Sequence, residues 1–211
     1  MIDAVVFDFG GVLTHPFLPA IIQAATEAGL DPVSLGSLLQ PMFAGAEDTD
    51  LPAHRLERGE ITLDVFFASL GDGEAAARTL LSPTSPYFVL DRLRPHEGML
   101  AFSCEVHASG RRMAILTNDA IEWRPTWDAV IGSAPQFDHV VRSSLLGMRK
   151  PDPRIYTAVL DHLGVPAGAC LFIDDFAPMA AAAQAVGMQA IHLVDHDAAI
   201  ADARRMLGLA A

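Results

Sequence analysis

Four groups of polar residues in this chain have the side-chain types that chemistry on a phosphoryl group requires. They are Asp8, Thr117-Asn118, Lys150 and Asp174-Asp175. Acids from two places in the chain would form a hard-oxygen site of the kind that Mg²⁺ prefers, and a lysine and a hydroxyl beside it would suit a phosphoryl group. The glycine pair at 10–11 leaves backbone amides and carbonyls free to approach a small charged group. The combination predicts one site, provided that the fold brings the groups together.

Each group taken alone also has an ordinary structural explanation. Asp8 could brace a turn, Thr117 could cap the next helix, and Lys150 could be a solvated loop residue. Asp174-Asp175 could be the N-cap pair of a helix. These explanations do not account for the combination, in which three groups follow apolar runs and the fourth lies in a loop.

A parallel sheet would bring the four groups together. Short apolar runs predict strands at residues 5–7, 113–116, 140–142, 169–173 and 189–193. Helical patterns lie between them at 96–108, around Trp123 and Trp127, at 153–163 and at 177–186. The predicted fold is therefore α/β, a Rossmann-like parallel-sheet core with helices on both faces. The carboxyl ends of its strands would share one edge, where such folds bind ligands.

Residues 15–95 form a helical insertion in this pattern. Apolar residues recur at helical spacing over 17–29, 32–43 and 62–70, and the polar segment 53–59 predicts a short exposed helix. Thr62 is predicted to cap its helix, with a buried stripe formed by Val65, Phe66, Phe67 and Leu70. Residues 1–14 and 96–211 would then form the core domain, and 15–95 a small all-helical domain.

Composition and charge exclude several classes of protein. Of the 211 residues 51% are hydrophobic and 19% charged, which indicates a globular chain. The net charge of −12 disfavours a nucleic-acid surface, and a site for an anion must supply its own positive charge. With no apolar run long enough to span a bilayer and no secretion signal, we expect no membrane partner and a cytoplasmic location. Cys104 and Cys170 are predicted to be buried thiols, although the sequence leaves a disulfide open.

The segments that carry the polar groups resemble the four motifs of the haloacid dehalogenase-like hydrolase superfamily, in the family's order. These segments are VVFDFGGVLT, ILTN, GMRKPDPRIY and LFIDD. The resemblance covers most of residues 1–14 and 96–193, and the insertion is similar to the small helical cap of subfamily IA. The stretch ERGEIT at 57–62 resembles one in the caps of phosphatase-like relatives. The ordered set of motifs is far more specific than any one of them.

The resemblance implies a Mg²⁺-dependent phosphatase that acts on a small phosphorylated metabolite, for example a sugar phosphate. Asp8 would be the nucleophile and form an aspartyl-phosphate. Mg²⁺ would be held by Asp8, the backbone carbonyl of Gly10 and Asp175, with Asp174 close by. Thr117 and the adjacent amide of Asn118 would bind phosphoryl oxygens, and Lys150 would neutralise the nucleophile and the transferring group. The protein would be a monomer or a homodimer.

Two positions depart from the family pattern. Gly10 stands where most family phosphatases have an aspartate that acts as general acid, which is typically worth about 100- to 10,000-fold in rate. His15 is a conceivable substitute, although an ordinary loop histidine is the simpler interpretation. Met179 stands where the family has Asp or Asn, which predicts weaker support of the metal site.

Two other functions stay open. In a 2-haloacid dehalogenase Asp8 would attack carbon without a metal, although that branch has an aromatic residue where this chain has Gly10. A catalytically weakened member would bind a phosphorylated ligand or a partner protein. Residues of the insertion and its surroundings would select the substrate, and the candidates are His54, Arg55, Arg58, Trp123 and Arg124.

Overall fold

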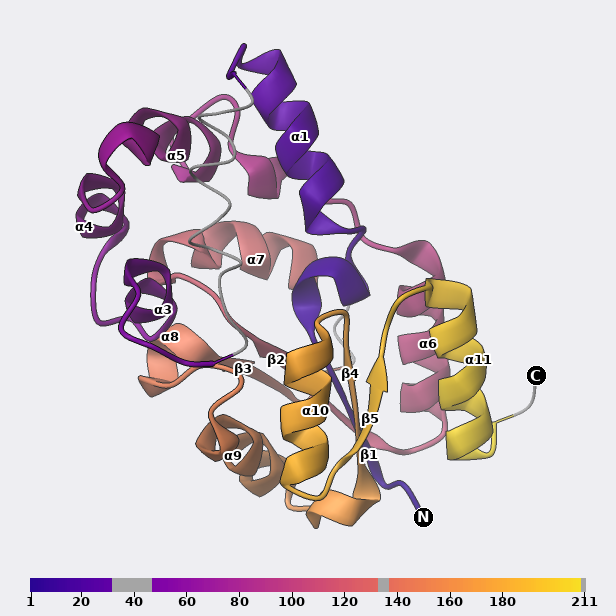
Figure 1. Cartoon of the computed structure of the whole chain (residues 1–211). Coiled ribbons are helices and arrows are strands. Elements are labelled where there is room, and N and C mark those ends of the chain that lie inside the picture. Colours follow the sequence, from indigo (N-terminus) through magenta and orange to yellow (C-terminus); the bar gives the residue numbers. More distant parts are fainter. Residues whose placement is uncertain (32–46, 133–136, 210–211) are drawn as a thin grey trace.

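A computed structural model describes residues 1–31, 47–132 and 137–209, and its centre is a five-stranded parallel sheet (Figure 1). The strands are β1 (Ala4–Phe7), β2 (Arg112–Thr117), β3 (His139–Arg142), β4 (Cys170–Asp174) and β5 (Gln189–His192). Their order is β3-β2-β1-β4-β5, and each neighbouring pair is parallel. The α/β fold and all five strands predicted from the apolar runs are therefore confirmed.

Alternating strand residues build a hydrophobic core on each face of the sheet. Val5 and Phe7 of β1 belong to the cluster that contains residues of α6 (Glu97–Ala108) and α11 (His196–Leu207). Ala4 and Val6 belong to the cluster that contains residues of α9 (Pro153–Leu163) and α10 (Ala177–Ala185). Strands that are buried on both faces read as continuous apolar runs, which is why their sequences show no alternation.

The remaining helices lie in the insertion or close to the strand ends. They are α1 (Phe17–Glu27), α3 (Pro52–Glu57), α4 (Leu63–Ala68), α5 (Glu74–Leu81), α7 (Arg124–Ile131) and α8 (Ser143–Leu146). The predicted helices at 17–29, 62–70, 96–108, 153–163 and 177–186 are confirmed with small shifts of their ends. The predicted helix at 32–43 falls outside the described residues. The helices α5 and α11 were not assigned from the sequence as separate segments.

The insertion leaves the core after Thr14 and returns at Pro95. These two residues form an isolated antiparallel bridge, and hydrogen bonds on either side join His15 N to Arg94 O (2.9 Å) and His96 N to Leu13 O (2.9 Å). The segment that enters the insertion, around Thr14, therefore lies beside the segment that leaves it, around Pro95. Figure 1 shows α1, α4 and α5 at the end of the molecule opposite the two termini, beyond the carboxyl edge of the sheet.

Three local predictions are wrong. Val65 is 54% exposed, because the helix that Thr62 caps begins at Leu63 and buries Leu63, Phe66 and Phe67 instead. The helix at 53–59 is present as α3, but it is largely buried, since it packs against α8. Cys104 is an exposed thiol on α6, whereas Cys170 is buried, and both are free. Within the described residues no helix is long and apolar enough to cross a membrane.

Candidate active site

The ammonium group of Lys150 lies between two carboxylates at the carboxyl edge of the sheet. Its Nζ atom is 2.7 Å from Asp8 Oδ1 and 2.6 Å from Asp174 Oδ2. The sheet register explains this meeting: Phe7 of β1 pairs with Ile173 of β4, so the next residues, Asp8 and Asp174, are level. A hydrogen bond from Asp8 N to Ile173 O (2.8 Å) continues the hydrogen bonding between β1 and β4 by one residue. It fixes the backbone from which the Asp8 side chain projects.

Asn118 holds the loop that carries Lys150. Its Oδ1 accepts a hydrogen bond from Lys150 N (2.8 Å), and its Nδ2 donates one to Lys150 O (3.1 Å). Both polar atoms of the amide are thus engaged by the backbone of one residue. The neighbouring Thr117 ends β2, and its hydroxyl donates only a long hydrogen bond to Asn118 O (3.3 Å). The Asn118 side chain therefore positions Lys150, while the Thr117 hydroxyl is free to exchange that weak bond for a stronger one.

Three carboxylates form a cluster beside the ammonium. Asp8, Asp174 and Asp175 each offer an oxygen, and these oxygens lie within 4.8 Å of one another. Asp174 also accepts a hydrogen bond from Phe176 N on Oδ1 (2.8 Å), so both of its oxygens have partners. Three carboxylates at this separation repel one another unless cations lie among them. The oxygen-only donor set fits a hard divalent cation such as Mg²⁺.

Gly11 makes room for this cluster. Its φ is +84°, and a Cβ atom there would lie 2.2 Å from Asp175 Oδ2, so only glycine fits. Gly10 differs, because its φ is −72° and a Cβ atom would meet only Trp127 Cη2, at the ordinary distance of 3.8 Å. The glycine that the close approach requires is therefore the second of the pair, which the sequence did not distinguish from the first.

Burial and neighbouring charges shift the pKa values of the cluster. Burial, together with the neighbouring Asp174 and Asp175, raises the pKa of Asp8 to about 7 against the opposing effect of the Lys150 ammonium. Burial and Asp174 raise the pKa of Asp175 to about 6. Burial alone would lower the pKa of Lys150, but the carboxylates of Asp174 and Asp8 raise it overall, so this side chain stays charged. A further cation at the cluster would favour the ionised acids.

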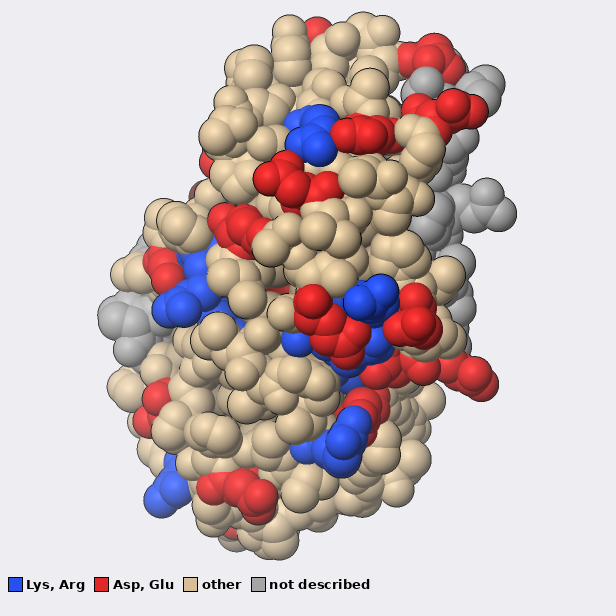
Figure 2. Space-filling model, turned by 90° about the vertical axis from the view of Figure 1, so that its left-hand side faces the viewer, with Lys and Arg blue, Asp and Glu red and all other residues tan. Residues whose placement is uncertain are grey.

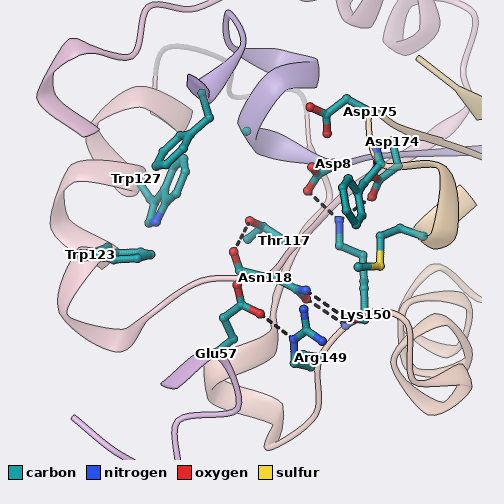
Figure 3. A pocket seen from close by; sticks show the side chains of 14 residues that line it. Asp8, Glu57, Thr117, Asn118, Trp123, Trp127, Arg149, Lys150, Asp174 and Asp175 are labelled. Carbon is teal, nitrogen blue, oxygen red and sulfur yellow. Dashed lines mark hydrogen bonds and ion pairs between the residues drawn. The ribbon is translucent and has the colours of Figure 1, made fainter. Parts of the chain in front are cut away.

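These groups line one cavity of about 210 Å³ (Figure 3). Its described lining residues are Asp8, Gly10, Phe17, Glu57, Thr117, Asn118, Trp123, Trp127, Arg149, Lys150, Asp174, Asp175, Phe176 and Met179. Every residue that the sequence analysis assigned to the site is among them. The structure thus brings the four polar groups together, and the roles assigned to them stay predictions.

A family model for haloacid dehalogenase-like hydrolases matches residues 2–187 of the chain. The chain belongs to this hydrolase family. The sesquiterpene phosphatase astK of Aspergillus oryzae is 30% identical over 97% of the chain and 96% of its own length. The phosphoglycolate phosphatase of Rhodospirillum rubrum is 27% identical over 90% of the chain and 79% of its own length.

Other relatives are much longer than this hydrolase. Acyl-CoA dehydrogenase family member 10 of Mus musculus is 28% identical over 97% of the chain, which spans only 19% of that protein. Among solved structures, a predicted HAD-like family hydrolase of Porphyromonas gingivalis superposes with a TM-score of 0.69 at 20% identity over 98% of both chains. The HAD family enzyme bt-2542 of Bacteroides thetaiotaomicron, in complex with magnesium and inorganic phosphate, gives a TM-score of 0.62 at 18% identity over 90% of this chain and 93% of that one. These two likenesses confirm the fold.

An ion pair from the insertion closes one side of the hydrolase site. Arg149 Nε donates to Glu57 Oε2 (2.5 Å), and Asp48 Oδ1 lies 3.7 Å from Arg149 Nη1. Burial raises the pKa of Glu57, against the opposing effect of Arg149. The sequence analysis quoted both residues inside larger motifs but assigned neither to the site. The available signal was the adjacency of Arg149 to Lys150; nothing in the sequence indicated its partner.

Most of the residues suggested for substrate selection lie elsewhere. Of the five candidates only Trp123 lines the cavity. His54 is buried and accepts a hydrogen bond from Thr49 N (3.0 Å), and Arg58 pairs with Asp48 and Glu60. The ring of His15, the conceivable proton donor, is tilted by 58° to that of His96 with ring centroids 5.0 Å apart, and His15 is not among the described lining residues.

Proposed function

We propose that this hydrolase is a Mg²⁺-dependent phosphatase in which Asp8 accepts the phosphoryl group of a small monoester. The observation that carries this proposal is the Lys150 ammonium held within 2.7 Å of Asp8 beside two further acids in one cavity. A nucleophilic carboxylate and an anionic phosphate ester repel each other, so their reaction requires cations at the point of contact. The phosphatase relatives support the same choice among hydrolase reactions.

Asp8, the backbone carbonyl of Gly10 and Asp175 would hold the metal ion, with Asp174 beside them. The cluster of oxygens within 4.8 Å and the space that Gly11 leaves for Asp175 fit such an ion. When bound, Mg²⁺ supplies positive charge to the acids and to the phosphoryl oxygens. Asp174 also accepts a hydrogen bond from the Lys150 ammonium, which bonds to Asp8 as well. Asp174 therefore helps to fix the position of the ammonium.

The reaction would proceed in two displacements at phosphorus. A carboxylate oxygen of Asp8 forms a bond to phosphorus while the bond from phosphorus to the ester oxygen breaks, and the leaving oxygen takes a proton from solvent water to become the alcohol. Water then attacks the same phosphorus, which releases inorganic phosphate and restores the Asp8 carboxylate. Lys150 and the Thr117 hydroxyl would hold the oxygens of the transferring group in both steps.

We also propose that residues 15–95 act as the cap over this site. The support is that the segment leaves the core beside the place where it returns, since Thr14 and Pro95 form an isolated bridge. Two of its described residues, Phe17 and Glu57, line the cavity together with residues of the core. A substrate would therefore contact both parts at once.

Phosphate release by the purified protein tests the proposal. The substrates are p-nitrophenyl phosphate, glucose 6-phosphate and hexyl phosphate, each with Mg²⁺ and with EDTA. We expect release that requires Mg²⁺, returns when Mg²⁺ is added in excess of EDTA, and is absent in Asp8→Asn. Chloride release from 2-chloropropionate in EDTA would instead identify a dehalogenase. Folded protein that releases neither product would be the binding member considered above, and the proposal would be wrong.

A further inference from the structure

We infer that the group esterified to the phosphate is apolar, so that the preferred substrates are monophosphates of hydrocarbon chains such as alkyl or prenyl alcohols. This inference rests on the proposed phosphatase function and names its substrate class. It departs from the sugar phosphates that the sequence suggested. The reason lies in the part of the cavity that would surround the leaving alcohol.

Five apolar side chains are among the described lining residues of the cavity. They are Phe17, Trp123, Trp127, Phe176 and Met179, and of these Phe176 lies beside the acids, since its N–H donates a hydrogen bond to Asp174. Figure 3 shows the two tryptophans across the cavity from Asp8, Asp174, Asp175 and Lys150, with Thr117 between the two sides. A phosphoryl group at Asp8 would therefore direct its ester group toward the rings. Aromatic side chains bind hydrocarbon surface well, because contact removes apolar area from water on both partners.

The Asn118 amide and one oxygen of Glu57 already have partners. Both ends of the Asn118 amide are bonded to the backbone of Lys150, and the Glu57 carboxylate is paired with Arg149. A sugar would bring several hydroxyl groups into this part of the cavity. Each hydroxyl that lost water without gaining a partner would disfavour binding, whereas a methylene group needs no partner.

Two donors beside the cavity have no hydrogen-bond partner among the described residues. They are Trp127 Nε1 and Arg149 Nη1, the second of which has the Asp48 carboxylate 3.7 Å away. Both atoms are buried from water, so a substrate oxygen in the cavity would not reach them either. They therefore do not supply the partners that a sugar would require.

The cavity has room for more than the phosphoryl group. A closed apolar cavity of about 150 Å³ is enough for benzene, and this one measures about 210 Å³. Phe176 is 38% exposed, so the apolar wall continues to the molecular surface. An alkyl group of several carbons could therefore contact apolar side chains both inside the cavity and at its opening.

A series of linear alkyl monophosphates tests the inference. Ethyl, butyl, hexyl and octyl phosphate have leaving groups of nearly equal basicity, so differences in kcat/KM report contacts of the chain. We expect kcat/KM to rise by about two- to fourfold for each methylene group until the chain leaves the cavity. Propyl phosphate should also exceed glycerol 3-phosphate, which has the same carbon skeleton with two hydroxyl groups, by about tenfold or more.

Matched variants test where the alkyl chain of the substrate binds. Phe17→Ser removes one ring of the wall, and Leu18→Ser removes a neighbouring side chain of α1 that is 49% exposed and not a lining residue. We expect the rise with chain length to flatten in Phe17→Ser and to persist in Leu18→Ser. If Phe17→Ser does not fold, as judged by its thermal transition, Phe176→Ser takes its place and should flatten the rise in the same way.

The outcomes distinguish a wrong substrate class from a wrong phosphatase function. Mg²⁺-dependent hydrolysis with no dependence on chain length, or with glycerol 3-phosphate preferred, would overturn the inference and leave the phosphatase intact. If kcat/KM still rises with chain length after the ring substitutions, the alkyl chain binds outside this cavity, and the inference is also overturned. Absence of phosphate release from every ester would instead contradict the proposed function.

Discussion

The environment of Asp8 is suited to a carboxylate that must be both ionised and reactive. Burial removes the water that would stabilise the anion, and the pKa of Asp8 is raised to about 7. The Lys150 ammonium, 2.7 Å from Asp8 Oδ1, opposes this effect and keeps a positive charge beside the carboxylate. A desolvated carboxylate beside a fixed cation is a better nucleophile for phosphorus than a hydrated one.

Replacing Asp8 by Asn should abolish turnover without unfolding the protein. Asparagine has the same shape but offers no anionic oxygen for attack, so we expect kcat to fall by about 1,000-fold or more. The matched control is Asp161→Asn, an exposed acid on α9, which should retain the wild-type rate. Phosphate release and circular dichroism of both variants measure the two effects. Wild-type turnover by the Asp8 variant would rule out this residue as the nucleophile.

The two glycines after Asp8 should differ sharply in their tolerance of alanine. In Gly11→Ala the new Cβ would lie 2.2 Å from Asp175 Oδ2 at a φ of +84°, so the acid or the loop must move. In Gly10→Ala the nearest atom is 3.8 Å away at an ordinary φ. We expect Gly11→Ala to lose at least about tenfold more kcat/KM than Gly10→Ala. Steady-state kinetics at saturating Mg²⁺ measure this, and equal losses would contradict the described loop.

At the scale of elements, the strands were easier to predict than the insertion. Buried strands such as β4 read as apolar runs, and the acids that follow them mark the carboxyl edge of the sheet. The burial of α3 was not predictable, because its polar sequence is accommodated by Arg149, which is 92 residues from Glu57. Likewise, the apolar wall that includes Phe17 and Trp127 consists of residues that any core would contain, and only the fold places them around Asp8.

Hydrogen bonding should distinguish the two tryptophans that line the cavity. Trp123 Nε1 donates to Leu81 O (2.9 Å) and so ties the core to α5, whereas Trp127 Nε1 has no partner among the described residues. Both substitutions to Phe remove the same ring atoms, but Trp123→Phe also leaves a buried carbonyl without its donor. We expect its free energy of unfolding to fall by about 1–2 kcal/mol more than that of Trp127→Phe. Urea denaturation measures both, and equal losses would show that the bond to Leu81 contributes nothing.

At the scale of the whole molecule, the cations of the site act against the charge of the chain. The net charge is −12, and on the face drawn in Figure 2 the Lys and Arg side chains lie among Asp and Glu. The general field therefore repels an anionic ester. Lys150, which is buried at the cavity, provides positive charge where the substrate would bind, whereas the charge of Arg149 is matched by its ion pair with Glu57. Association with substrate is thus governed by the site and not by long-range attraction.

Magnesium should stabilise the whole protein, and more so at alkaline pH. The pKa values of Asp8 and Asp175, about 7 and about 6, lie above the ordinary value of 3.8. The metal-free folded protein therefore binds more protons than the unfolded chain between about pH 4 and 7, and its stability falls as the pH rises through this range. A bound cation requires the ionised acids, so its stabilising effect grows over the same range.

Thermal unfolding with Mg²⁺ or EDTA at pH 5.5 and pH 8 tests this. At 100 times the dissociation constant, Mg²⁺ stabilises by about 2.7 kcal/mol, which raises Tm by about 5–10 °C for a chain of this size. We expect a shift of that order at pH 8, a smaller one at pH 5.5, and almost none in Asp175→Asn. NaCl at equal ionic strength is the control. An equal or larger shift at pH 5.5 would contradict the assignment of these acids as ligands.

The most direct test of the central claim is a crystal structure of the protein grown with Mg²⁺ and beryllium fluoride, which mimics a phosphoryl group on a carboxylate. The predicted result is beryllium bonded to an oxygen of Asp8, with fluorines contacted by Lys150 Nζ and the Thr117 hydroxyl and a metal ion between Asp8 and Asp175. Beryllium fluoride bound at another residue, or a well-ordered Asp8 left unmodified beside an occupied metal site, would contradict it.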